Sequence, residues 1–178
     1  MTSKQKKIIA ALLILFAAAV AVLLFLNRGT MEAGQAAQRD RTLSVTSNGE
    51  VICVLDFSAL QGLPAETFET TVRSHGMKPE AVTYRGVEIH KVLEAAGIEP
   101  KGKDVLYFKG ADTYLATVKA EELSEYDTIY VVYEKNGERM ALRSENGEGP
   151  YQVVLLSDSF SQRWCKFLSE IEWKQGEE

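Results

Sequence analysis

Residues 84–97 read YRGVEIHKVLEAAG, and this stretch has the clearest local structure signal in the chain. Four of its apolar residues follow the i, i+3, i+4, i+7 spacing that places side chains on one face of a helix, namely Ile89, Val92, Leu93 and Ala96. Gly97 follows them and is a typical residue just after a helix end. The pattern predicts a helix over Val87–Ala96, with His90 on its polar side as a surface residue.

The chain on both sides of this helix reads as short strands. Asn48-Gly49 and Asn136-Gly137 each lie between two strand-like runs and favour tight hairpins, and a third turn is expected at Gly110–Asp112. The predicted strands are Thr42–Thr46, Glu50–Leu55, Phe68–Arg73, Val105–Phe108, Tyr114–Val118, Ile129–Glu134, Glu138–Leu142, Gln152–Leu156 and Phe167–Trp173. Many strands with an inserted helix predict an α+β domain with a mixed sheet.

The N-terminal part of the sequence has a different character. Ile8–Leu26 is an unbroken apolar run, and a helix of about 20 such residues spans a bilayer core. We expect a basic stub over 1–7, a transmembrane anchor over 8–26, a spacer over 27–41 and one domain over 42–174. A cleaved signal peptide is the alternative, because small residues suited to cleavage follow at 33–37. A buried core helix fits poorly, since the run has no polar face.

The distribution of charge along the chain predicts on which side of the membrane the domain lies and argues against one class of partner. Three lysines precede the apolar run, so the positive-inside tendency predicts a single-pass protein of the cell membrane with its C-terminal domain outside the cytoplasm. The chain has a formal net charge of −5, and without those lysines the remainder carries −8. Such an acidic body argues against nucleic acid as a partner.

Several common site types have no support in the sequence. The two histidines and two cysteines form no CxxC or HExxH motif, and no glycine-rich phosphate loop is present. Cys53 and Cys165 could pair outside the cytoplasm or remain free thiols, and sequence leaves both open. We therefore predict no metal site built by the protein's own side chains.

The order of motifs resembles the molybdopterin-binding domain of the sulfite oxidase family, over roughly Leu43–Trp173. The segments that carry the resemblance are Tyr84–Gly97, Gly110–Tyr114, Tyr133–Glu138, Gly149–Tyr151 and the closing Arg163–Glu172. The resemblance implies the same mixed-sheet fold, and it makes molybdopterin a possible cofactor. It does not by itself settle an activity.

The same resemblance implies where a cofactor would lie. Enzymes of this family hold molybdenum through a cysteine thiolate at the end of an early strand, and Ser74 falls at that place here. No cysteine lies between Cys53 and Cys165 that could fill it. The implied ligand-binding residues are Ser74, His75, Arg163 and Lys166, the last two because the family's closing basic segment contacts the cofactor.

Three functions remain open at this point. The first is a membrane-anchored, extracytoplasmic binding domain without redox catalysis of its own, which takes an anionic small molecule near these residues. The second is a molybdopterin-dependent oxidoreductase module that passes electrons to a membrane protein. The third is a structural or protein-interaction domain of the cell envelope. No catalytic residue is predicted, because Ser74 and His75 are adjacent and neighbouring side chains on a strand point to opposite faces.

Overall fold

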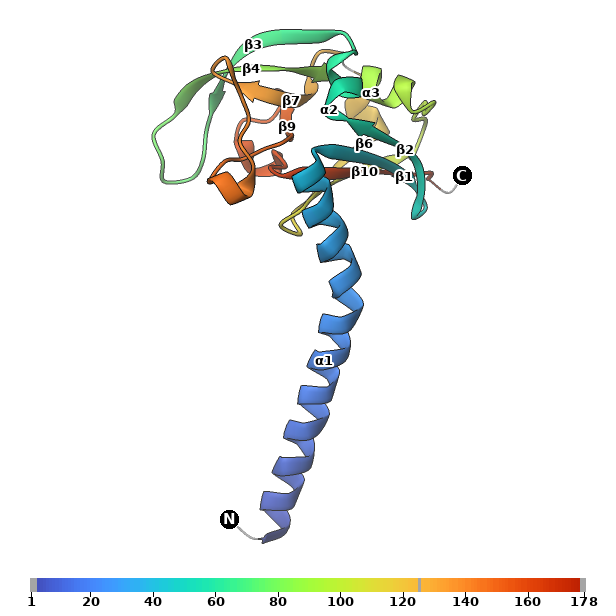
Figure 1. Cartoon of the computed structure of the whole chain (residues 1–178), viewed down its shortest axis with the longest axis vertical. Coiled ribbons are helices and arrows are strands. Elements are labelled where there is room, and N and C mark those ends of the chain that lie inside the picture. Colours follow the sequence, from blue (N-terminus) through green and yellow to red (C-terminus); the bar gives the residue numbers. More distant parts are fainter. Residues whose placement is uncertain (1–2, 125, 177–178) are drawn as a thin grey trace. The chain divides into compact units, whose positions relative to one another are not determined.

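The computed structural model describes residues 3–124 and 126–176 (Figure 1). A long helix, α1 (Ser3–Asp40), begins the chain and includes both the apolar run and most of the expected spacer. The chain divides into two units, residues 1–33 and residues 34–178. Among the described residues, no helix combines the length and the apolar character needed to cross a membrane.

The second unit contains two five-stranded sheets. The first sheet has the order β2-β1-β10-β5-β6, in which β1 runs parallel to β10 and the other neighbours are antiparallel (Figure 1). Its strands are β1 (Thr42–Ser47), β2 (Glu50–Asp56), β5 (Val105–Gly110), β6 (Leu115–Lys119) and β10 (Leu168–Lys174). The parallel pair joins the first and last strands of the unit, so its two ends are held together.

The second sheet is antiparallel and has β7 as its most connected strand. It has the order β3-β4-β7, and β7 also pairs with β8 and β9. Its strands are β3 (Ala65–Val72), β4 (Glu80–Glu88), β7 (Ile129–Lys135), β8 (Glu138–Arg139) and β9 (Gln152–Leu155). The short helical elements are α2 (Phe57–Gln61), α3 (Ile89–Ala95), η1 (Ala120–Ser124), η2 (Arg143–Glu145) and η3 (Ser161–Arg163).

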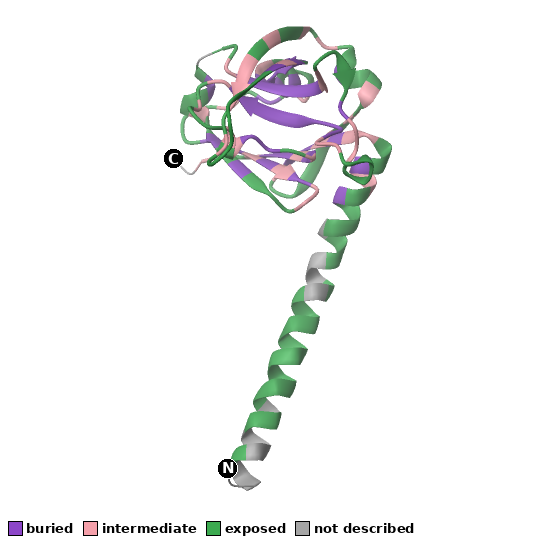
Figure 2. Cartoon of the chain, turned by 90° about the vertical axis from the view of Figure 1, so that its left-hand side faces the viewer, coloured by how far each residue is buried: buried purple, intermediate pink, exposed green. Residues whose placement is uncertain are grey.

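One hydrophobic core holds the two sheets together. Its buried side chains come from both sheets and from α3, and the central strands are the most buried segments (Figure 2). Removal of this apolar surface from water is the main force that stabilises the fold. Gly86 lies where β4 bulges against β7, and an added Cβ there would come within 2.5 Å of the Val131 carbonyl oxygen. Gly86, the third residue of the segment Tyr84–Gly97, is therefore required by close packing of the two strands.

Most of the predicted elements are present, with three corrections. The Asn48-Gly49 and Asn136-Gly137 hairpins are confirmed, with positive φ at all four residues. The helix predicted over Val87–Ala96 begins only at Ile89, because Val87 and Glu88 still pair with β7. Most of β4 and the whole of α2 were not predicted, and the strand predicted over Glu138–Leu142 has only two residues.

Candidate functional site

The loop after β3 contains the first segment of the predicted site, and it contacts the second segment, around η3, through hydrogen bonds. Ser74 lies in this loop, and its Oγ is 3.3 Å from the Oγ of Ser161 in η3. The backbone N–H and hydroxyl of Ser161 also donate hydrogen bonds to the Arg73 carbonyl oxygen, at 3.0 Å and 2.9 Å. Residues 87 positions apart are thus fixed side by side by polar contacts.

A polar hollow of about 430 Å³ opens beside these contacts. It is lined by Thr70, Thr71, Arg73, Leu156, Ser157, Asp158 and Ser159. Hydroxyl groups dominate the lining, and Arg73 is exposed with no ion-pair partner among the described residues. An uncompensated guanidinium beside several hydroxyl donors is an arrangement suited to a small anion.

Arg163 lies near this hollow, but its guanidinium is already occupied. Its Nε and one Nη donate to the two carboxylate oxygens of Asp158, at 2.9 Å and 2.5 Å. The other Nη donates to Glu122 at 2.8 Å. Burial raises the pKa of the Glu122 carboxyl, but hydrogen bonds from the Lys119 N–H and from Arg163 lower it more. This arginine therefore connects the loop after β9, η1 and η3 and has little charge left for a ligand.

Lys166 is engaged in the same way. Its ammonium group forms an ion pair with Glu148, which also pairs with Lys135 at 2.9 Å. Burial raises the pKa of Glu148, while its hydrogen bonds to Lys166 and Lys135 lower it below the ordinary value. Lys166 thus neutralises a half-buried carboxylate. The residue after this lysine, Phe167, has φ of 54°, a strained conformation for an aromatic residue.

Neither cysteine offers a thiolate to this site. Cys165 is fully buried, and burial raises its pKa to about 12, so the thiol is protonated at neutral pH. Cys53 lies on β2, at the edge of the other sheet, and burial raises its pKa as well. Both are free, so the pairing left open by the sequence does not form.

The structure brings together part of the predicted set. Ser74 and the segment of Arg163 meet through Ser161, whereas Lys166 belongs to a separate ion pair with Glu148. His75 is exposed in the loop after β3, with no hydrogen bond among the described residues. Sequence reasoning missed Arg73, Asp158 and Ser161. Arg73 adjoins the predicted Ser74, which was a usable signal, while the other two contacts depend on the fold.

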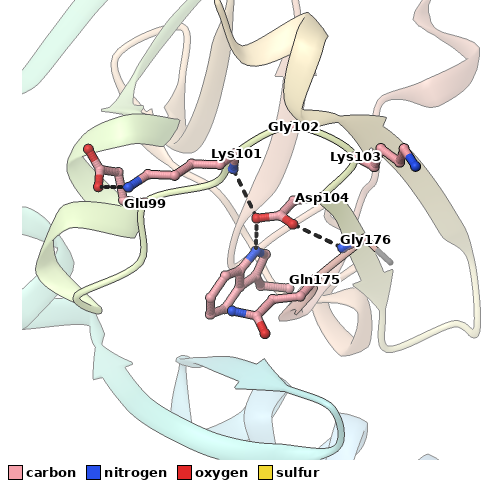
Figure 3. A pocket seen from close by; sticks show the side chains of 8 residues that line it. Glu99, Lys101, Gly102, Lys103, Asp104, Gln175 and Gly176 are labelled. Carbon is pink, nitrogen blue, oxygen red and sulfur yellow. Dashed lines mark hydrogen bonds and ion pairs between the residues drawn. The ribbon is translucent and has the colours of Figure 1, made fainter. Parts of the chain in front are cut away.

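A second cavity, of about 600 Å³, lies where the C-terminal tail meets the loop before β5 (Figure 3). The buried carboxylate of Asp104 accepts hydrogen bonds from the N–H groups of Lys101 and Gly176, at 2.9 Å each. It also accepts one from the Trp173 indole at 3.0 Å. Burial raises the pKa of Asp104, but these three donors together lower it below its ordinary value. The carboxylate is saturated by internal donors, which indicates a structural role.

Comparison with known proteins places this geometry in a family. The model of the oxidoreductase molybdopterin binding domain matches residues 33–178, so the chain belongs to that family. Among solved structures, the sulfane dehydrogenase SoxCD from Paracoccus pantotrophus is similar, with a TM-score of 0.61 and 21% identity. The likeness covers 78% of this chain and 39% of that one, so this chain spans well under half of its neighbour. No curated protein sequence gives a significant match.

Proposed function

We propose that this protein is a membrane-anchored, extracytoplasmic member of the molybdopterin-binding family that binds a small anion and has no redox catalysis of its own. The observation that carries the proposal is the contact between Ser74 and Ser161, with the uncompensated Arg73 beside it. Hydroxyl groups stand where the family resemblance places a metal-binding thiolate. The hollow retains donors for an anion but offers no soft ligand for molybdenum.

The described residues fit the family's metal centre poorly. A thiolate must be ionised and accessible to bind a metal, and Cys165, the cysteine in the same segment as Ser161 and Arg163, is buried and protonated. The two cations expected to contact a cofactor, Arg163 and Lys166, are both held by carboxylates. We therefore assign no reaction step to molybdopterin in this chain.

The membrane part of the proposal rests on the sequence of α1. Its apolar side chains include Ile14, Phe16 and Phe25, which are 70%, 69% and 75% exposed and have no core of their own to enter. Such a surface is unfavourable in water and favourable in lipid. The lysines that precede the run support an orientation with the domain outside the cytoplasm.

The proposal is tested by metal analysis of the full-length protein in a neutral detergent. The protein is purified from cells that make the molybdenum cofactor and export the chain folded, and its molybdenum content is measured by mass spectrometry. We expect background metal in a folded sample. A near-stoichiometric content would contradict the proposal and favour the alternative supported by family membership, a molybdopterin-dependent oxidoreductase module that serves a membrane partner.

A second measurement tests the anion site itself. Thermal unfolding is followed with increasing phosphate or sulfate, because a ligand that binds the native state raises the melting temperature. We expect stabilisation that the Arg73→Gln variant loses. Arg39→Gln is the matched control, since Arg39 is an exposed arginine paired only with its neighbour Asp40. If neither anion stabilises the protein, a structural or protein-interaction role in the cell envelope becomes the better proposal.

A further inference from the structure

A third cavity, of about 610 Å³, is formed by elements that do not line the hollow at Ser74. It lies between α3, the loop that follows this helix, η1 and Tyr126. Three of its lining residues, Leu93, Ile98 and Leu123, belong to the hydrophobic core, so the cavity has an apolar floor. Its volume lies within the range of small-molecule sites, about 300–1,000 Å³.

A buried carboxylate orients the imidazole that lines this cavity. Glu88 is 5% exposed, and one of its carboxylate oxygens lies 2.6 Å from Nδ1 of His90. Its other oxygen accepts a hydrogen bond from the His90 backbone N–H at 2.8 Å. Since a carboxylate only accepts hydrogen bonds, the neutral ring carries its proton on Nδ1 and its Nε2 is an acceptor. The side chain of His90 is 22% exposed, so it is less exposed than the predicted surface position implies.

Tyr126 supplies an aromatic surface next to this imidazole. The two rings stack with centroids 4.3 Å apart and planes inclined by 29°. Tyr126 is 69% exposed, and one of its faces is therefore free for a further ring or a cation. A large exposed aromatic residue at the mouth of an apolar cavity is a typical binding element.

The rim of the cavity carries two carboxylates that are only weakly engaged. Glu94 pairs with Lys91 at 3.1 Å, and Glu99 pairs with Lys101 at 2.7 Å. Lys91 is about half exposed and the other three side chains are largely exposed, and exposed ion pairs contribute little. These carboxylates can therefore accept a competing cation at low cost.

We propose that this cavity binds a small arylalkyl amine, a molecule with an aromatic ring and a protonated aliphatic amino group. The protonated amino group donates hydrogen bonds to Nε2 of His90 and to the carboxylates at the rim, and the ring packs against Tyr126 and the apolar floor. The proposal is for binding alone, and the Ser124 hydroxyl in the lining already donates to the Glu121 carbonyl oxygen at 2.7 Å. The inference does not depend on the anion site at Ser74.

The two histidines of the chain make the proposal testable by nuclear magnetic resonance. Full-length protein in a neutral detergent is labelled at histidine and titrated with phenethylamine at mildly alkaline pH. We expect the imidazole signals of His90 to move and those of the exposed His75 to stay. The uncharged 2-phenylethanol and the anionic 3-phenylpropanoate should move His90 at least tenfold less at equal concentration.

Two variants locate the binding site. His90→Asn removes the oriented acceptor and Tyr126→Ala removes the exposed ring, and each should weaken phenethylamine binding about tenfold, the size of one lost interaction with a charged group. Tyr126 is exposed, so its removal leaves the fold intact, and binding to this variant is followed through the His90 signals. For the other variant, binding is followed by calorimetry, with His75→Asn as the matched control.

The inference is overturned by either of two results. One is a titration in which phenethylamine leaves His90 unmoved up to millimolar concentration, or moves both histidines equally. The other is an equal response to the amine, the alcohol and the carboxylate, which would show that the cavity does not select a cation. Neither result bears on the metal content or on stabilisation by phosphate.

Discussion

Asp104 and Glu88 are both buried carboxylates, 8% and 5% exposed, yet their surroundings differ. Asp104 accepts hydrogen bonds from three separate donors, and all of them belong to the protein. Both oxygens of Glu88 interact with a single residue, His90, whose other ring nitrogen is left as an acceptor at a cavity. The donors around Asp104 hold parts of the chain together. Glu88 instead orients the side chain of His90, which in our proposal contacts a ligand.

The comparison shows how to separate structural acids from functional ones in this fold. Burial alone does not distinguish them, because the two exposures are nearly equal. The number of independent donors does distinguish them. A carboxylate whose oxygens already accept from several groups inside the protein has less capacity left to bind a ligand. Asp104 holds the end of β10 and the tail to the loop before β5 (Figure 3). Glu88 fixes only the first turn of α3.

The largest effect is expected for removal of the Asp104 carboxylate. Asp104→Ala leaves the N–H groups of Lys101, Gly176 and Trp173 without their acceptor, and each was bound to a charged group. We expect a loss of about 3 kcal/mol in the free energy of unfolding, measured by urea denaturation. Glu99→Ala is the control and should change stability by less than about 0.5 kcal/mol, because its ion pair is exposed. Equal losses in the two variants would show that the three hydrogen bonds do not stabilise the fold.

A smaller effect is expected in the pH dependence of stability. The folded-state pKa of Asp104 lies below its ordinary value, so the unfolded chain takes up a proton at a higher pH than the folded protein. The stabilisation by this carboxylate is therefore fully present at neutral pH and is lost as the pH falls through the folded-state value. Asp104→Asn should reduce stability at neutral pH and flatten its acid dependence below about pH 4. An unchanged acid slope would contradict the assignment.

The elements that sequence predicted correctly are those whose chemistry is local. Asn48-Gly49 and Asn136-Gly137 adopt the positive φ angles of tight hairpins without help from distant residues. The helix predicted over Val87–Ala96 overlaps the last two residues of β4, where pairing with β7 outweighs the helical spacing. Local pattern identified the elements, and tertiary contact set their ends.

The candidate sites were less predictable for the same reason. Ser74 and Ser161 are 87 positions apart, and no feature of either segment indicates that the two hydroxyls meet. Arg163 was predicted as a ligand-binding cation, but its partners Asp158 and Glu122 come from separate elements. A basic residue in a family motif shows where a charge lies, whereas its availability depends on acids that the fold brings to it.

The last prediction concerns the direction of the His90 hydrogen bond. In Glu88→Gln the amide oxygen can still accept from the His90 backbone N–H, but the amide nitrogen can only donate, so it faces Nδ1 as a donor. The neutral ring should then move its proton to Nε2, which nitrogen chemical shifts of labelled histidine report directly. The cost in stability should be about 1 kcal/mol, because only one hydrogen bond changes direction. This is less than for Asp104→Ala, which leaves three donors without an acceptor. The same change turns Nε2 from an acceptor into a donor and should weaken phenethylamine binding, even though every ring remains in place. If the proton stays on Nδ1 in this variant, Glu88 does not orient His90, and the difference between the two buried acids would have to lie elsewhere.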